Sequence, residues 1–185
     1  MKYFKKIDLP SYDILLTFNE MLENNAITWQ THTKGDTQIC INTVPGHDDP
    51  HYGVGSLYYD FSTSSNNQLI RVVRDPILTE SDFSELCSVF KDTIIEEMYN
   101  ELKKHYRIGR VRFMRSFPKT CLTWHTDTST RLHYPLLTHE GCFMVIEDEV
   151  MHIPQNEWWE TNTLKPHTAF NGSTEERLHL VASIL

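Results

Sequence analysis

From Arg107 to Leu185, short segments in which apolar and polar residues alternate follow one another at regular spacing. A period of two places successive side chains on opposite faces of a strand, so each segment is expected to have one buried face. Turn residues separate the segments, which predicts a series of antiparallel strands. The predicted strands are 107–114, 121–126, 131–137, 142–147, 149–153, 157–162, 166–170 and 176–184.

The first hundred residues favour helices. A helix is expected from Ser11, as its N-cap, to Asn24, because apolar residues recur there at helical spacing. A longer helix is expected from Thr79, capped with Asp82, to His105, with a purely structural role. Two short strands are expected between the helices, at 37–44 and 55–61. Strands after N-terminal helices predict a mainly β fold of the α+β type, a double-sheet jelly roll with helices packed on one sheet.

The chain is expected to form a single domain. Its 185 residues are enough to bury a core, and no linker, repeat or low-complexity segment divides it. Within this domain, residues 1–106 are the helical part and residues 107–185 the jelly-roll core. The stretch 45–67 is rich in turn residues and is the expected lid over the barrel mouth, the alternative being an inert connection.

Composition excludes several classes of protein. A net charge of −8 and a pI near 5.6 argue against a nucleic-acid binder, which normally carries a basic surface. No apolar run approaches the roughly 20 residues that span a bilayer, and the first ten residues lack the apolar region of a secretion signal. The four cysteines form no C-x-x-C pair, as is typical of reduced thiols. The sequence therefore predicts a soluble cytoplasmic protein with no nucleic-acid or membrane partner.

Two histidines and an aspartate in the last third of the chain form a candidate metal site. His125 and Asp127 are two positions apart, so both side chains point to the same side of an extended strand end. His167 supplies a third ligand from elsewhere. Two imidazoles and a carboxylate hold Fe(II) on one face and leave the other open, although zinc tolerates the same ligands. A second H-x-D motif, His47 to Asp49, is expected to form a solvated turn, the alternative being a surface metal site.

Arg177 follows His167 by ten positions and is expected on the inward, polar face of the last predicted strand. An arginine inside a barrel needs an anion, and its fixed fork of donors fits a carboxylate at two points. The ion and this arginine together suggest a bound keto-dicarboxylic acid.

The pattern of His125, Asp127, His167 and Arg177 resembles that of the Fe(II)- and 2-oxoglutarate-dependent oxygenases. This resemblance implies a double-stranded β-helix, or cupin-like jelly roll, and an oxidoreductase that couples decarboxylation of 2-oxoglutarate to hydroxylation. His125, Asp127 and His167 would then be the catalytic metal ligands.

Two further stretches narrow the resemblance. Arg131–Leu136 and His167–Leu180 are similar to the aspartyl/asparaginyl β-hydroxylase-like branch, which includes small prolyl hydroxylases; the similarity covers roughly residues 107–185. It implies a dioxygenase that hydroxylates an amino-acid side chain, either free or within a peptide or protein. Some members of that branch lack the carboxylate ligand, whereas this chain has Asp127.

The same resemblance implies how 2-oxoglutarate is bound. Arg177 would pair with its distal carboxylate. His133 lies where the resemblance implies a contact to the nearer carboxylate, the alternative being a histidine bonded within the barrel wall.

Candidates for substrate binding are Arg112, Arg131 and Trp124. The arginines lie near the barrel strands and are suited to a substrate carboxylate, the alternative being that they are solvated. Trp124 is a candidate wall of the pocket, the alternative being a core position.

Two other functions remain open. A non-catalytic jelly-roll module could hold a structural metal with the same three ligands, but such a module has no need of a buried arginine at position 177. A nucleic-acid dealkylase on the same scaffold is disfavoured by the acidic composition.

Overall fold

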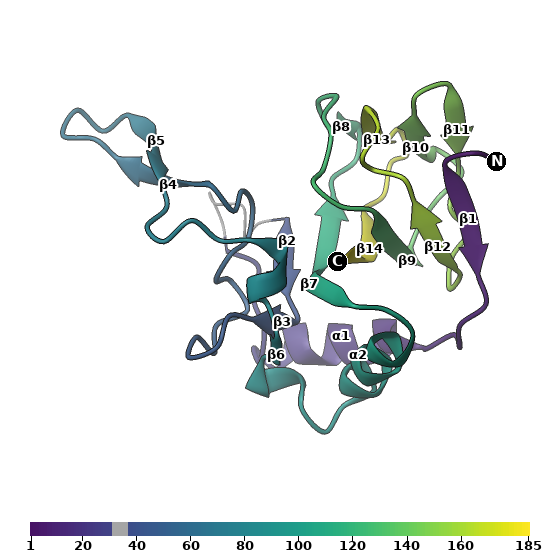
Figure 1. Cartoon of the computed structure of the whole chain (residues 1–185), viewed down its shortest axis with the longest axis horizontal. Coiled ribbons are helices and arrows are strands. Elements are labelled where there is room, and N and C mark those ends of the chain that lie inside the picture. The colour runs from purple at the N-terminus through teal and green to yellow at the C-terminus, as the bar shows by residue number, and fades with distance from the viewer. Residues whose placement is uncertain (31–36) are drawn as a thin grey trace.

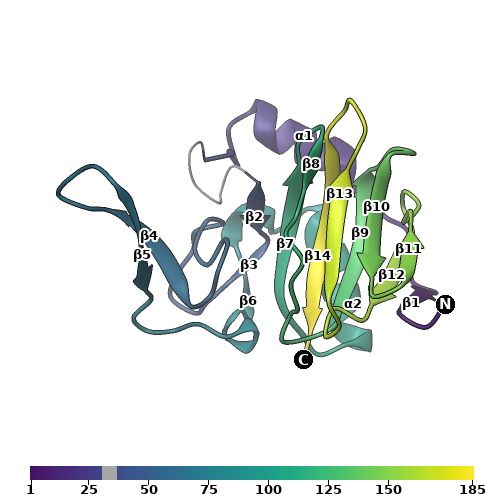
Figure 2. The same cartoon turned by 90° about the horizontal axis from the view of Figure 1, so that it is seen from above.

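The computed structural model describes residues 1–30 and 37–185, and its centre is a pair of facing antiparallel sheets (Figure 1). The larger sheet has the order β1-β12-β9-β14-β7-β2, with strands β1 (Phe4–Ile7), β12 (Trp158–Thr161), β9 (Arg131–Leu137), β14 (Arg177–Ile184), β7 (Ile108–Ser116) and β2 (Gln38–Cys40). The smaller sheet has the order β11-β10-β13-β8, with strands β11 (Glu149–Met151), β10 (Cys142–Ile146), β13 (His167–Asn171) and β8 (Thr120–Cys121). From β7 onward the chain passes repeatedly between the two sheets (Figure 2), which confirms the predicted jelly roll, a double-stranded β-helix.

Helices α1 (Ile14–Glu23) and α2 (Ile94–His105) cover the outer face of the larger sheet (Figure 1). Phe18 of α1 packs on Phe113 of β7 with ring centroids 4.4 Å apart, and Met98 of α2 is buried in the same cluster. Every second residue of β14, at 178, 180 and 182, joins this core. The residues between them face the smaller sheet and line a cavity, so the alternation along β14 separates the core from the candidate site.

Two strands of the larger sheet come from the first hundred residues. β1 pairs with β12 and β2 pairs with β7. The sequence pattern does not predict β1, so the division at residue 106 leaves part of the larger sheet in the helical part. The strand predicted at 37–44 is divided between β2 and β3 (Asn42–Thr43), and β3 pairs instead with β6 (Glu85–Leu86).

The long helix predicted from Thr79 to His105 is wrong in its first half. Thr79 and Asp82 do form the predicted cap, with the Thr79 N–H donating to the Asp82 carboxylate at 2.6 Å, but they cap only a short 3-10 turn. The chain then forms β6 and a second 3-10 turn before α2 begins at Ile94. The apolar residues of this stretch serve two different clusters: Phe83 packs with Leu57 and Leu78, whereas Cys87 and Phe90 join the core under the larger sheet. One straight helix cannot reach both clusters, so tertiary packing overrides the helical spacing of these apolar residues. The predicted end of α2 at His105 is confirmed.

The first helix also begins later than predicted. Ser11 is not its N-cap, because the Ser11 hydroxyl donates to the Asn156 carbonyl at 2.9 Å, and Asp13 occupies the cap position. This contact ties the chain before α1 to the strand connection before β12. The predicted end at Asn24 is confirmed.

The stretch predicted as a lid, 45–67, contains β4 (Tyr59–Thr63), which pairs with β5 (Leu69–Val73), just beyond that stretch, in a hairpin that extends away from the two sheets (Figures 1 and 2). The strand predicted at 55–61 therefore begins only at Tyr59. Residues 55–58, at the base of the hairpin, line the cavity. Closure of the cavity by this stretch stays a prediction.

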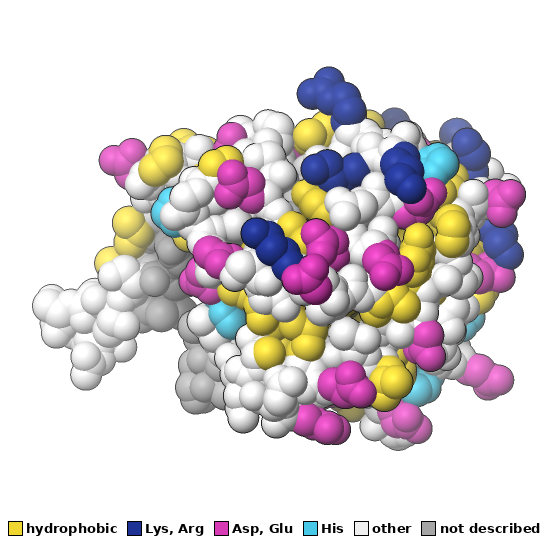
Figure 3. Space-filling model, turned by 90° about the horizontal axis from the view of Figure 1, so that it is seen from below, with side chains coloured by type: hydrophobic (Ala, Val, Ile, Leu, Met, Phe, Trp, Pro, Cys, Tyr) yellow, Lys and Arg dark blue, Asp and Glu magenta, His cyan; other side chains and the backbone are white. Residues whose placement is uncertain are grey.

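One face of the outer surface mixes charges of both signs. On the face drawn in Figure 3, acidic side chains are interspersed with lysine and arginine. None of the helices among the described residues has the length and apolarity needed to span a bilayer.

Candidate metal centre

Backbone pairing between two segments brings the predicted ligands together. His167 is the first residue of β13, and His125 bridges to it: the His125 N–H donates to the His167 carbonyl at 3.1 Å and the His167 N–H to the His125 carbonyl at 2.9 Å. The Asp127 N–H donates to the Thr163 carbonyl at 2.8 Å. Regular pairing of β8 ends at Cys121, so His125 and Asp127 lie on an irregular extended segment and not on the regular strand predicted at 121–126.

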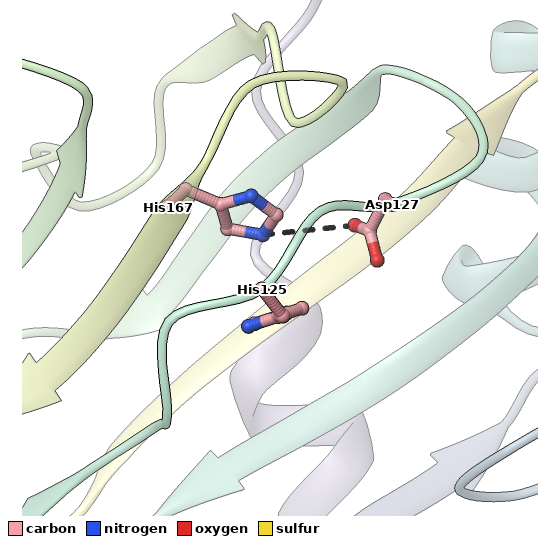
Figure 4. Close-up of side chains that lie close together, drawn as sticks. All are labelled: His125, Asp127 and His167. Carbon is pink, nitrogen blue, oxygen red and sulfur yellow. Dashed lines mark ion pairs between the residues drawn. The ribbon is translucent and has the colours of Figure 1, made fainter.

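The three side chains converge on one point (Figure 4). One ligand atom from each of His125, Asp127 and His167 lies within 4.8 Å of the others, and Asp127 Oδ2 is 3.8 Å from His167 Nε2. His125 is exposed to the cavity side of the chain whereas His167 is buried. Such a cluster fits a metal ion that is held on one side and open on the other.

Hydrogen bonds to backbone carbonyls fix the tautomer of both imidazoles. Nδ1 of His125 lies 2.7 Å from the Thr123 carbonyl, and Nδ1 of His167 lies 2.9 Å from the Lys165 carbonyl. A carbonyl can only accept, so each Nδ1 carries the proton and each Nε2 keeps its lone pair for a metal. Burial lowers the pKa of His167, which favours the neutral form that binds metal. The donor set therefore fits Fe(II).

The second H-x-D motif has a different role. Asp48 accepts a hydrogen bond from the Ser88 N–H at 2.7 Å and another from the Ser88 hydroxyl, and the His47 ring stacks on Tyr52. No second group of three potential metal ligands is found in residues 1–30 and 37–185. The predicted turn is confirmed, and its aspartate anchors the loop to the chain before α2.

A cavity of about 1040 Å³ adjoins the three ligands. Its larger-sheet wall includes inward residues of three neighbouring strands, among them Arg110 and Arg112 of β7, Arg177, His179 and Val181 of β14, and Arg131 and His133 of β9. The wall is thus strongly cationic. The number of carboxylates that neutralise these arginines decides whether the cavity attracts anions.

Arg177 is 7% exposed and has no carboxylate within 4.0 Å among the described residues. Its Nε donates to His179 Nε2 at 2.9 Å, and its Nη2 lies 3.0 Å from His179 Nδ1. Burial lowers the pKa of Arg177 to about 10, still well above neutrality. A buried cation without an anionic partner is costly, so this position is suited to an anion from outside the chain.

His133 lies on the neighbouring strand β9, opposite Val181 and close to His179 of β14. Its Nδ1 is 3.5 Å from His179 Nδ1, and its Nε2 is buried without a hydrogen-bond partner among the described residues. Burial, followed by the charge of Arg177, holds the pKa of His133 well below its usual value. His133 is therefore a neutral side chain with one nitrogen free for a ligand in the cavity.

Glu80 is a site residue that sequence reasoning missed. It is 8% exposed, and its carboxylate accepts from Arg110 at 3.2 Å, from Arg131 at 2.9 Å and from the Ser183 hydroxyl at 2.9 Å. Arg131 in turn donates through Nε to Asp127 Oδ2 at 3.0 Å. The segment 79–105 is thus not purely a scaffold, because its first turn supports a candidate metal ligand, Asp127, through Arg131. Partners 30 to 103 positions away in the chain leave no local signal in the sequence.

We expect Glu80→Gln to destabilise the fold at neutral pH and to reduce its sensitivity to acid. Burial raises the pKa of Glu80, but the charges of Arg110, Arg112 and Arg131 outweigh it and hold the pKa at about 2, against 4.5 for an unperturbed glutamate. Because the folded-state pKa is depressed, this stabilisation is complete above about pH 4.5 and is lost as the pH falls towards 2. Urea unfolding of wild type and variant should differ by about 3 kcal/mol at pH 7 and progressively less below pH 4.

Glu97→Gln, on the exposed face of α2, is the matched control for this substitution. This variant should leave the urea midpoint of unfolding almost unchanged at pH 7 and at pH 2.5. An equal loss of stability at pH 7 and pH 2.5 in Glu80→Gln would show that the carboxylate charge is not what stabilises the cluster.

Known proteins resemble the part of the chain that carries this site. The family model described as aspartyl/asparaginyl β-hydroxylase matches residues 78–185, a span that begins just before Glu80 and includes all three candidate ligands. The chain belongs to the aspartyl/asparaginyl β-hydroxylase family. Membership confirms the branch indicated by the stretches around Arg131 and His167.

Within and beyond the hydroxylase family, several proteins are similar to parts of this chain. L-proline cis-4-hydroxylase of Rhizobium meliloti (strain 1021) is 35% identical over 92 residues, which are 44% of this chain and 33% of the relative. The aligned region thus spans only a third of that enzyme. A 2OG-Fe(II) oxygenase family oxidoreductase from Burkholderia pseudomallei shares 14% identity, with 68% of this chain and 65% of that chain covered and a TM-score of 0.39. A cupin domain from Bordetella pertussis Tohama I shares 15% identity, with coverages of 43% and 83% and a TM-score of 0.38.

The predicted substrate-binding residues of this family member lie in different surroundings. Arg112 and Arg131 both line the cavity, but Arg131 has all its nitrogens bonded to protein groups, namely Asp127, Ser129, Ser183 and Glu80. Trp124 is 57% exposed and is not part of the cavity wall. Arg112 alone of these three combines burial with a nitrogen that lacks a partner among the described residues.

Proposed function

We propose that the chain is an Fe(II)- and 2-oxoglutarate-dependent dioxygenase that hydroxylates an amino-acid side chain. His125, Asp127 and His167 would hold the iron, and Arg177 would bind the distal carboxylate of 2-oxoglutarate. The observation that carries this proposal is the buried, carboxylate-free Arg177 on the wall of the cavity that adjoins the three ligands. A structural metal site alone gives no reason to bury that charge.

Bound iron would supply the oxidising chemistry, coupling the decarboxylation of 2-oxoglutarate to succinate and CO2 with hydroxylation of an unactivated C–H bond. The protein's own residues bind and orient. Arg177 offers two N–H groups to a carboxylate, and neutral His133 offers Nε2 to the nearer carboxylate end. Arg131 holds Asp127 in place for the metal. None of these roles requires an acid or a base.

Free L-proline is the first substrate to test, since the relative named as an L-proline cis-4-hydroxylase is 35% identical over the aligned region. A residue within a peptide or protein is the broader alternative. We place the enzyme in the cytoplasm, because its four cysteines are free thiols, as expected in a reducing compartment. The acidic composition argues against a nucleic-acid substrate.

Succinate release from 2-oxoglutarate under Fe(II) and air tests the proposal directly. We expect release that L-proline or another amino acid in a panel stimulates, and that disappears when Fe(II) is chelated. Tight metal binding without succinate release under any condition would instead assign the chain to the non-catalytic binding modules.

A further inference from the structure

The hairpin of β4 and β5, residues 59–73, is an apolar arm that projects from the body of the protein. It extends away from the two facing sheets (Figures 1 and 2), and no third strand among the described residues pairs with it. Tyr59, Ile70, Val72 and Val73 are between 40% and 58% exposed. A two-stranded hairpin alone in water is only marginally stable. The arm therefore has the properties of a surface that another molecule covers.

Contacts at the root of the arm hold it in this outward position. Leu57 and Leu78, which flank the arm in the chain, are buried in one cluster, and the Leu78 N–H donates to the Leu57 carbonyl at 3.1 Å. Arg74 Nε donates to the Ser56 carbonyl at 3.0 Å. Because both ends of the arm are fastened to the body, its apolar side chains are presented to solvent, where a second molecule can reach them.

β5 presents an open edge with the backbone groups that strand pairing needs. The Arg74 N–H donates to the Tyr58 carbonyl at 2.9 Å, across the hairpin. Because successive residues of an antiparallel strand alternate in direction, the N–H and C=O groups of Arg71 and Val73 point away from β4. The strand has the sequence LIRVV and contains no proline, lysine or bulge, the features that commonly protect an edge. Such an edge is suited to pairing with another chain.

Both faces of the arm carry apolar side chains. On one face Tyr59 pairs in register with Val73, and the Arg71 guanidinium carbon lies 5.2 Å from the centroid of the Tyr59 ring. Ile70 and Val72 alternate with these residues along β5 and lie on the other face. A strand added to β5 would therefore extend two apolar faces at once.

Charge favours a second copy of this chain as the partner. Residues 59–73 contain one acid and one base, Asp60 and Arg71, so the arm has no net charge and the rest of the chain carries the whole charge of −8. Two copies that meet through other surfaces bring like-charged bodies together. Contact through the arms joins neutral apolar surfaces and keeps the bodies apart. A partner recognised by its charge would bind the acidic body and not this arm.

We propose that two copies of this chain associate by pairing their β5 strands edge to edge, antiparallel about a twofold axis. The two hairpins then form one continuous sheet in the order β4-β5-β5-β4. A twofold axis places one residue of β5 opposite its own copy. At Arg71 two guanidinium groups would face each other, which is destabilising, so the axis lies at Ile70 or Val72, where apolar side chains meet. This association does not depend on the proposed activity.

Sedimentation of the wild-type protein measures the association. One hairpin per partner makes a small interface, below about 1,200 Å² in total, so we expect a monomer–dimer equilibrium between about 1 and 200 µM. Val72→Asp should remain monomeric over this range with an unchanged melting temperature of the body. Val150→Asp, the same substitution at an exposed valine of the edge strand β11, is the matched control and should dimerise like the wild type. A wild type that stays monomeric throughout, or a Val72→Asp dimer of undiminished stability, overturns the inference.

Cysteine crosslinking locates the axis and decides the matter should Val72→Asp fail to fold. Opposite residues of a non-hydrogen-bonded antiparallel pair have Cα atoms about 4.5 Å apart, which a disulfide can span. Under mild oxidation Ile70→Cys or Val72→Cys should give a dimer linked through the new cysteine, as identified by peptide mapping. Val150→Cys, and the wild type with its native cysteines, should give none. No linked dimer at either position overturns the inference, and protection of the arm from proteolysis in such a monomer would show that it folds back on its own chain.

Discussion

His167→Ala is expected to abolish Fe(II) binding and turnover while the fold stays intact. His167 lies at the start of β13, and its imidazole Nε2 is one of three ligand atoms that lie within 4.8 Å of one another. Loss of one ligand from a site that already keeps positions open leaves too few donors for tight binding. The two backbone hydrogen bonds to His125 involve no side chain, so the strand end should remain paired. His125→Ala should behave in the same way.

Metal affinity is measured by anaerobic titration with Fe(II), and the fold by circular dichroism and thermal unfolding. His105→Ala is the control, because this histidine is exposed at the end of α2 and pairs with Glu101, far from the candidate ligands in sequence. Undiminished turnover in either ligand variant would eliminate the metal centre. Asp127→Ala should lower the affinity for Fe(II) less than either histidine variant does, because members of the branch that this chain resembles exist without the carboxylate ligand. It also removes a hydrogen-bond partner of Arg131.

The second half of the fold could be predicted closely from the sequence because its strands are short and one-sided. The prediction for 131–137 coincides with β9, and that for 176–184 differs from β14 by one residue. One face of each strand packs on α1, α2 or the core between the sheets, so burial and the period of two agree. The predicted metal ligands come together because two of them share one extended segment and the third lies opposite on β13.

The first half could not be predicted as well, because long-range contacts decide its structure. Between Thr79 and Phe90 the apolar spacing fits a helix, yet Leu86 pairs in a strand with Asn42 and Phe83 fills a separate cluster. The same contacts turn Glu80 towards the cavity, where it meets arginines from β7 and β9. Nothing local distinguishes this glutamate from the solvated ones of α2. The substrate-binding predictions share this limit, since only the ion pairs in the fold separate the engaged Arg131 from Arg112.

Two buried arginines that have no carboxylate partner among the described residues, Arg112 and Arg177, line the cavity. Arg177 contacts His179 on β14, which in turn lies close to His133 on β9, and Arg112 is directed towards β2. The candidate metal ligands join the same cavity from the smaller sheet and the segment before β9. The cavity therefore combines a candidate metal site with two buried cations that are suited to bound anions.

Arg177→Leu is expected to raise the dissociation constant for 2-oxoglutarate steeply while the affinity for Fe(II) changes little. Truncating one partner of a buried, hydrogen-bonded charge pair costs about 2–5 kcal/mol. Among the described residues the side chain is hydrogen-bonded to His179 and to none of the three candidate ligands, so the metal site should be preserved. Calorimetric titration of 2-oxoglutarate into the Fe(II)-loaded protein without oxygen measures the first quantity, and titration of Fe(II) the second. Arg177→Lys, which keeps the charge but not the fork of donors, should fall between wild type and Arg177→Leu.

Stability in the absence of ligand gives an independent test of the same arginine. The wild type buries the Arg177 charge without an anion, which opposes folding, whereas leucine at this position carries no such penalty. Arg177→Leu should therefore unfold at the same temperature as the wild type or higher when 2-oxoglutarate is absent. Added 2-oxoglutarate should then raise the melting temperature of the wild type and not that of the variant, because only a folded state that binds the ligand is stabilised by it. Equal stabilisation of both proteins by 2-oxoglutarate would show that the co-substrate binds elsewhere and would remove the main support for the proposed activity.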